Sequence, residues 1–124
     1  MAHRDLDVLD AAEQAVDGIN RLIDRDGRRL LHAAQMRDSV QSIAANISEA
    51  FGKSGPRDRA RSLEIARAET EETLSHLGAN FRSNRVAAAD YWPLRNRLVV
   101  IAKMLSALIH RLAREPRRFD APRR

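Results

Sequence analysis

The sequence contains no cysteine, which excludes disulfide bonds and thiolate metal sites. Aromatic residues make up only 4% of the chain, so its core has to be built from aliphatic side chains. No apolar run approaches the roughly 18 residues of a membrane-spanning helix. The N-terminus has acidic residues in place of the apolar segment of a signal peptide. We therefore expect a cytoplasmic protein without a membrane segment. Its 124 residues are enough to bury a core, which favours a single domain.

Charge is abundant but unevenly distributed along the chain. Residues 1–55 carry 7 basic and 9 acidic side chains, a net charge of −2, whereas residues 56–124 carry 15 and 8, a net charge of +7. A basic half favours a polyanion as partner, because Lys and Arg neutralise phosphates. Codon bias is the alternative explanation, since 20 of the 22 basic residues are Arg.

Apolar residues recur at steps of three and four in four stretches, which predicts four helices. The expected spans are Arg4 to Asp24, Leu30 to Phe51, Pro56 to Arg82 and about Asp90 to Arg114. The first buried stripe is predicted to contain Leu6, Leu9, Ala12, Val16, Ile19 and Ile23. The last helix is expected to start near Asp90, because Pro93 is tolerated only in a first turn.

The connections between these helices are short, so consecutive helices must run antiparallel. The predicted fold is all-α, an up-down-up-down antiparallel four-helix bundle over residues 1–114. Residues 115–124 contain two prolines and four arginines and are expected to form a basic C-terminal tail.

The last helix has more apolar surface than one bundle face requires. Placed at 100° per residue, its apolar residues cover an arc of about 220°, against about 100–140° for an ordinary surface helix. Such an excess indicates a second burial partner, and a subunit interface would supply one. The alternative is a helix sunk deeply in its own bundle. The predicted interface residues are Val100, Met104 and Ala107.

With these helices placed, two stretches resemble a known family. Residues 45–53 (ANISEAFGK) and 63–69 (LEIARAE) are similar to the motifs A-N-I-A-E-G-F-G-R and L-E-I-A-R-G-S of the large-subunit ribosomal RNA intervening-sequence proteins. Residues 103–109 resemble a third family motif, K-M-L-x-x-L-I. Ala50, Ala68 and Glu69 depart from the pattern, and Arg59 and Ser62 stand where relatives often have aromatics.

This resemblance implies a four-helix bundle that assembles into a homopentamer with a basic surface or pore. It implies no established enzymatic activity. The family is related to the accessory variability determinant proteins of diversity-generating retroelements, which bind a reverse transcriptase and nucleic acid. A reverse transcriptase is therefore one possible partner, and RNA or DNA another.

Two groups of basic residues are candidate phosphate sites. The first surrounds the start of the third helix, where free amides and the helix dipole favour an anion, and consists of Lys53, Arg57, Arg59 and Arg61. The second flanks the turn before the last helix and consists of Arg82, Arg85, Arg95 and Arg97. Tyr91 and Trp92 lie among the second group and could stack on bases. Trp92 is nevertheless expected to cap one end of the core. Solvated basic turns are the alternative for the first group.

Two polar pairs complete the candidates. Asn46 and Glu49 flank the stripe of the second helix, and we expect them to be structural, through hydrogen bonds across a helix interface. Glu72 and His76 are one residue too far apart for the Glu-x-x-His pattern of di-metal bundles, and no second copy exists. We therefore expect no metal, no cofactor and no enzymatic activity.

The sequence thus predicts an oligomeric bundle protein, non-enzymatic, that binds nucleic acid through basic patches. An accessory subunit of a reverse transcriptase and a purely structural oligomer are the alternatives.

Overall fold

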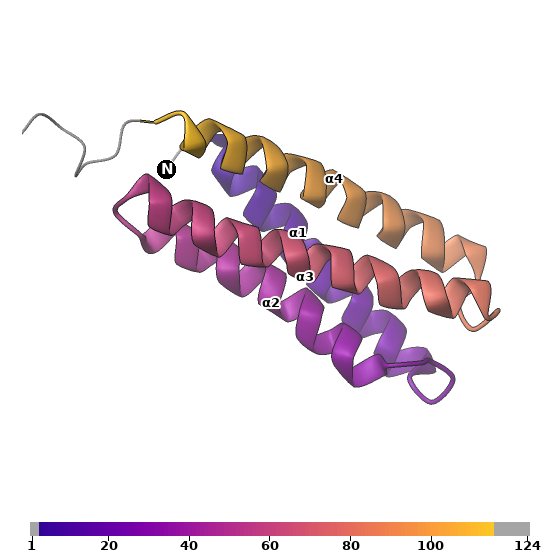
Figure 1. The fold of residues 1–124 in the computed structure, drawn as a ribbon. Coiled ribbons are helices and arrows are strands. Elements are labelled where there is room, and N and C mark those ends of the chain that lie inside the picture. The colour runs from indigo at the N-terminus through magenta and orange to yellow at the C-terminus, as the bar shows by residue number, and fades with distance from the viewer. Residues whose placement is uncertain (1–2, 116–124) are drawn as a thin grey trace, which may run out of the picture.

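The computed structural model describes residues 3–115, which form four α-helices connected by three short turns (Figure 1). The helices are α1 (His3–Asp26), α2 (Ala33–Gly52), α3 (Pro56–Arg82) and α4 (Ala88–Ala113). Each helix packs on the next, and α4 returns to α1. The predicted antiparallel four-helix bundle is therefore confirmed. The predicted tail, apart from Glu115, lies outside the described residues.

The predicted α3 has the same bounds as the observed helix, because its end signals are local. Gly55 precedes the helix in an extended conformation, and Pro56 occupies the first turn, where no amide donor is needed. The expected start of α4 near Asp90 is two residues late, since the helix begins at Ala88 and holds Pro93 inside it. Proline leaves the carbonyl of Ala89 without its helical donor, and Ala89 is exposed, so water can replace that donor.

The start of α2 differs more from the prediction. The helix begins at Ala33, and the three residues before it belong to the turn that follows α1. His32 adopts a left-handed conformation with φ 55° and ψ 39°. The backbone N–H of Leu31 donates to Oδ1 of Asn80 at 2.7 Å, and Nδ2 of Asn80 donates to the carbonyl of Leu31 at 3.0 Å. A side chain of α3 therefore holds this turn, which local sequence signals do not reveal.

The core is aliphatic and runs the length of the bundle. In α4 the buried residues recur at steps of three and four, and they are Leu98, Ile101, Leu105, Leu108 and Leu112, whereas Leu94 is only partly buried. In α1 the buried face is rotated from the predicted one. Leu9 and Val16 are only partly buried, and the fully enclosed residues are Val8, Ala12, Ala15 and Ile19.

Two buried hydroxyl groups link α2 to α3 within this core. Oγ of Ser39 and Oγ1 of Thr73 lie 2.7 Å apart. The same hydroxyl groups also reach backbone carbonyls of their own helices, at Met36 and Glu69. No buried side-chain nitrogen or oxygen among residues 3–115 lacks a hydrogen-bond partner, so these polar groups do not destabilise the core.

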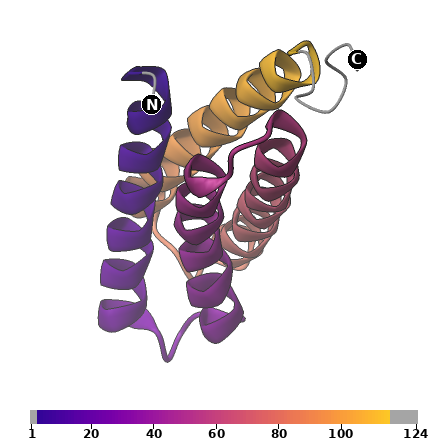
Figure 2. The same cartoon turned by 90° about the vertical axis from the view of Figure 1, so that its left-hand side faces the viewer.

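The α1–α4 seam is the least closely packed of the four. In the C-terminal half of α1, Gly18 allows a close approach to α4, because a Cβ there would lie 2.6 Å from Cδ2 of Leu94. The two helices diverge toward the N-terminus of α1 and the C-terminus of α4 (Figure 2). There, Asp7 of α1 and several residues of α4 line a pocket, which we call the α1–α4 groove.

Candidate nucleic-acid interface and assembly surface

The two predicted groups of basic residues lie at opposite ends of the bundle. The turn between α2 and α3 is at one end, and the turns of residues 27–32 and 83–87 are at the other (Figure 1). A helix of 26 residues such as α4 is about 39 Å long at 1.5 Å per residue. The two groups therefore cannot form one site within a single chain.

The group at the start of α3 is partly occupied by contacts within the protein. Nε of Arg59 donates to the carbonyl of Lys53 at 2.8 Å and so satisfies the end of α2. Nζ of Lys53 lies 3.4 Å from a carboxylate oxygen of Glu49. Arg57 and Arg61 are exposed, and Arg57 shares a shallow hollow with the carboxylates of Glu64 and Glu115. Local acidic side chains therefore weaken the positive potential of this end.

The opposite end carries an aromatic cluster. The rings of Phe81 and Tyr91 stack in parallel with centroids 4.0 Å apart, and Trp92 packs edge-on against both, at 5.9 and 4.9 Å. The expectation that Trp92 caps the core is wrong, because Trp92 is 48% exposed and Tyr91 is the one that packs on the core. The guanidinium of Arg95 lies 5.8 Å from the centre of the Trp92 ring, a cation–π arrangement.

Other arginines lie at the same end of the bundle. Arg82 and Arg85 are exposed, and Nη1 of Arg85 donates to the carbonyl of Arg29 at 2.8 Å. This bond joins the turn after α3 to the turn after α1. The exposed Arg28 and Arg29 therefore belong to the same end. We call this surface the arginine–tryptophan end, made up of Arg28, Arg29, Arg82, Arg85, Trp92 and Arg95.

Sequence reasoning missed Arg28 and Arg29 although a signal existed. In an up-down-up-down bundle the first and third turns share one end, so their charged residues can be grouped once the topology is assigned. Conversely, the sequence analysis placed Arg97 in this group, but its side chain lies on the α1 side of α4. Its Nη1 donates to Oε1 of Gln14 at 2.6 Å.

An ion-pair network ties α1 to α4 beside this end. Nη2 of Arg25 contacts carboxylate oxygens of Asp26 at 2.8 Å and of Asp90 at 2.6 Å. The two carboxylates raise the pKa of Arg25 above its usual value. The hydrogen bond from Arg25, with its positive charge, lowers the pKa of Asp26. Arg25 is thus neutralised locally and is not part of the cationic surface.

Asn46 and Glu49 do not bond across a helix interface. Nδ2 of Asn46 donates to the carbonyl and to Oγ of Ser42, both on α2, at 2.9 and 3.0 Å. Glu49 is exposed, and Oε1 of its carboxylate lies 3.4 Å from Nζ of Lys53, the residue that follows α2. The hydroxyl groups of Ser39 and Thr73 instead link α2 to α3, while Asn80 of α3 binds the turn before α2.

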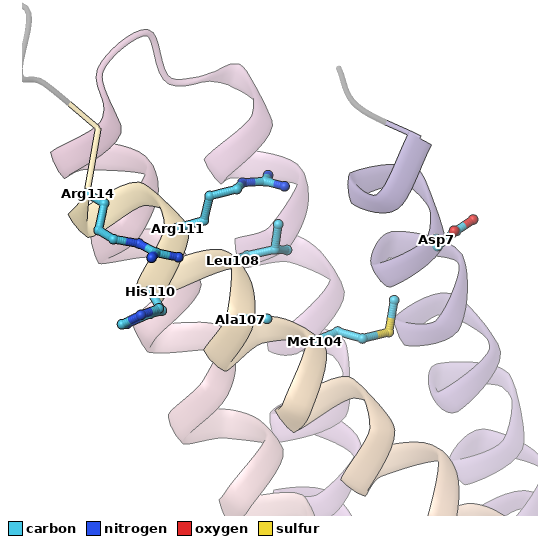
Figure 3. A pocket seen from close by; sticks show the side chains of 7 residues that line it. All are labelled: Asp7, Met104, Ala107, Leu108, His110, Arg111 and Arg114. Carbon is cyan, nitrogen blue, oxygen red and sulfur yellow. The ribbon is translucent and has the colours of Figure 1, made fainter.

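The predicted interface residues of α4 reach the surface. Val100 is 51% exposed, Ala107 is exposed and Met104 is half-buried. Met104 and Ala107 line the groove between the diverging ends of α1 and α4, with Leu108 also in its wall (Figure 3). The groove has a volume of about 450 Å³. Its charged rim includes Asp7, Arg111 and Arg114.

Two further features of the described chain concern metal binding and membrane insertion. Nε2 of His76 lies 4.0 Å from Oε2 of Glu72, and within residues 3–115 no three His, Asp or Glu side chains group as metal ligands would. None of the helices described is long and apolar enough to cross a membrane.

These features define an all-α bundle protein with a cationic, aromatic-bearing end. Comparison with known proteins shows the family to which this bundle protein belongs. Residues 4–107 match the model of the family described as 23S rRNA-intervening sequence protein, and the chain belongs to this family. The resemblance noted in the sequence is therefore confirmed.

A solved structure shares the fold. It is a crystal structure of a protein of unknown function from the S23 ribosomal protein family of Bacteroides thetaiotaomicron. The two chains are 27% identical, the TM-score is 0.78, and the match covers 86% of this chain and 98% of the other. A search among curated proteins found no match. Neither the family description nor that of the solved structure names an enzymatic activity.

Proposed function

We propose that this protein is a non-enzymatic nucleic-acid-binding protein that works as a homo-oligomer, a pentamer by analogy with the family. The arginine–tryptophan end is its principal contact surface. The observation that carries the proposal is the half-exposed indole of Trp92 with the guanidinium of Arg95 near its ring, at an end of the bundle that also carries exposed arginines. The family is described as 23S rRNA-intervening sequence protein, and this description supports a nucleic acid as the ligand.

The chemistry of this end suits a single strand or an unpaired loop. An exposed aromatic ring stacks on any base, since every base has a π-face, and the arginines around it hold phosphates. Stacking on a base face and contacts with phosphates carry little information about base sequence. We therefore expect affinity that depends strongly on salt and little on base sequence.

The apolar surface of α4 supports assembly. Val100, Met104 and Ala107 are accessible to a partner, and burying them would remove apolar area from water. An oligomer would also repeat the arginine–tryptophan end several times. Repeated weak contacts along one strand act together, so avidity would compensate for a modest single site.

Retention of single-stranded RNA and DNA between about 50 and 200 mM salt tests the proposal, because phosphate-driven affinity falls steeply over this range. Trp92→Ala should weaken binding about 5- to 150-fold, which corresponds to about 1–3 kcal/mol for one stacked base. Charge reversal of Arg28 and Arg82 should reduce the salt dependence, since two phosphate contacts are lost.

Charge reversal at the other end provides the matched comparison. Arg57→Glu with Arg61→Glu should have a smaller effect, because Glu64 and Glu115 already surround Arg57, and Arg21→Glu on α1 should have the smallest. Equal losses of affinity for all these charge reversals would indicate that binding depends on the overall charge of the protein and not on a defined surface. A folded and assembled protein that retains neither polymer at the lowest salt would refute the nucleic-acid proposal.

A further inference from the structure

Trp92 lies near the start of α4, in a segment that the rest of the helix holds less firmly. The helix begins at Ala88, and Pro93 follows Trp92 directly. Because proline has no backbone N–H, the carbonyl of Ala89 lacks its helical donor, and one hydrogen bond that would join this segment to the rest of α4 is missing. The indole is also 48% exposed, so the core does not enclose it. The position of Trp92 therefore depends on the contacts that residues 88–92 make with other helices.

A first contact fixes this segment to α3. The ring of Tyr91 stacks in parallel on the ring of Phe81, with centroids 4.0 Å apart. Tyr91 also packs against the aliphatic core, and Trp92 packs edge-on against both rings. Aromatic pairs of these two kinds contribute beyond the area that they bury. The aromatic cluster therefore anchors the segment on its α3 side.

A second contact fixes the same segment to α1. Nη2 of Arg25 donates to Oδ2 of Asp90 at 2.6 Å. Arg25 is itself oriented by Asp26, whose Oδ2 accepts from Nε at 3.0 Å and from Nη2 at 2.8 Å. Asp90 lies two residues before Trp92. The segment is therefore held from both sides, by aromatic stacking on α3 and by an ion pair with α1.

The ion pair contributes little to stability, and its carboxylates oppose the binding of a polyanion. The side chains of Arg25 and Asp90 are 56% and 34% exposed, and exposed ion pairs stabilise a fold only weakly. Asp26 and Asp90 also place two negative charges beside the arginine–tryptophan end, where they repel phosphates. What the pair provides is a fixed position for the segment that carries Trp92. A ring that is already held in place loses less freedom when a base stacks on it.

We propose that Arg25 and Asp90 are positioning residues, which hold Trp92 where an unpaired base of the bound strand stacks on its ring. This proposal rests on the proposed function and names the residues that prepare its stacking surface. In this arrangement neither residue contacts the nucleic acid. Their positioning effect on affinity acts through Trp92, so it disappears when the indole is removed.

A double-mutant cycle measures this effect separately from charge. Binding of labelled single-stranded oligouridine is followed at low salt for the wild type, Asp90→Asn, Trp92→Ala and the double variant. The loss of one negative charge acts equally with and without the indole, whereas the loss of positioning acts only when the indole is present. Asp90→Asn should therefore be less favourable for binding in the wild type than in Trp92→Ala, by about 2- to 5-fold in affinity, as expected for an exposed ion pair.

Arg25→Gln breaks the same ion pair from α1 and leaves Asp90 at the start of α4. It should give a similar ratio in the same cycle, which excludes an effect of Asp90 on the helix dipole, and it decides the question if Asp90→Asn fails to fold. Asp38→Asn is the matched control, because it removes one negative charge from an exposed position of α2, a helix that packs against α1 and α3. Its effect should be the same with and without the indole of Trp92. Circular dichroism checks that each variant is folded.

The fluorescence of Trp92 gives a second measurement, because the chain has only one tryptophan. In the free protein the ring should move more freely in Asp90→Asn, so its fluorescence anisotropy should fall below that of the wild type. In Asp38→Asn the anisotropy should stay at the wild-type value.

Different results would refute this proposal and the proposed function. If Asp90→Asn changes the affinity equally with and without the indole, or leaves the anisotropy of Trp92 unchanged, the positioning role is overturned and the proposed function stands. A folded and assembled wild type that does not bind oligouridine at low salt would refute the proposed function, and the positioning role with it.

Discussion

Asn80 holds the turn between α1 and α2 although it lies on α3. Its amide accepts from the backbone N–H of Leu31 and donates to the carbonyl of the same residue and to that of His76. Asn80 is fully buried. Its side chain supplies the hydrogen-bond partners that the backbone of the irregular turn cannot provide for itself. The turn can therefore hold His32 in its left-handed conformation.

Asn80→Ala should lower the free energy of unfolding by about 1–3 kcal/mol, because the backbone groups of Leu31 would lose their buried partners. Thermal or denaturant unfolding measures the change. Gln35→Ala removes an amide from an exposed position on α2, and it should have little effect. Equal unfolding midpoints for Asn80→Ala and the wild type would show that water replaces the amide.

At the scale of helices, the ion pairs of Arg25 connect the end of α1 to the start of α4. Asp26 has a lowered pKa because Arg25 donates a hydrogen bond to it and lies close with its positive charge. A carboxyl group whose pKa is lower in the folded state binds fewer protons there than in the unfolded state. Its stabilising effect is therefore complete above its unfolded pKa, which is about 3.9.

Acidification should remove this stabilising effect as the pH falls through the folded pKa of Asp26. The melting temperature of the wild type should therefore fall more between pH 6 and pH 2.5 than that of Asp26→Asn. The difference should be small, because the pair is exposed to solvent. Asp38→Asn, at an exposed position on α2, is the control. If the melting temperatures of the wild type and of Asp26→Asn fall equally over this pH range, the stabilising role assigned to Asp26 is contradicted.

At the scale of the whole molecule, we expect the apolar residues of α4 at the α1–α4 groove to form the interface of the proposed oligomer. Light scattering of the wild type at micromolar concentration should give several times 14.0 kDa. Met104→Glu should reduce this mass, because an unpaired charge buried in an interface costs several kcal/mol. An unchanged mass would show that Met104 lies outside the interface.

The fold was predictable from the sequence because its determinants are local. Helical periodicity depends on residues three and four apart, and the Gly55-Pro56 signal marks the start of α3 at the observed residue. Short turns then leave antiparallel packing as the arrangement for consecutive helices. The start of α2 was misplaced because Asn80, 49 residues from Leu31, holds the preceding turn.

The grouping of the charged residues was decided only by the tertiary structure. Arg95 and Arg97 are neighbours in sequence, yet two residues turn a helix by about 200°, so one lies near Trp92 and the other binds Gln14 of α1. Arg28 and Arg85 are far apart in sequence, yet the topology brings their turns to the same end. The sequence alone determined the class of fold, because periodicity is a property of each helix. The surfaces depend on helix rotation and on which turns meet, and both are set by packing between helices.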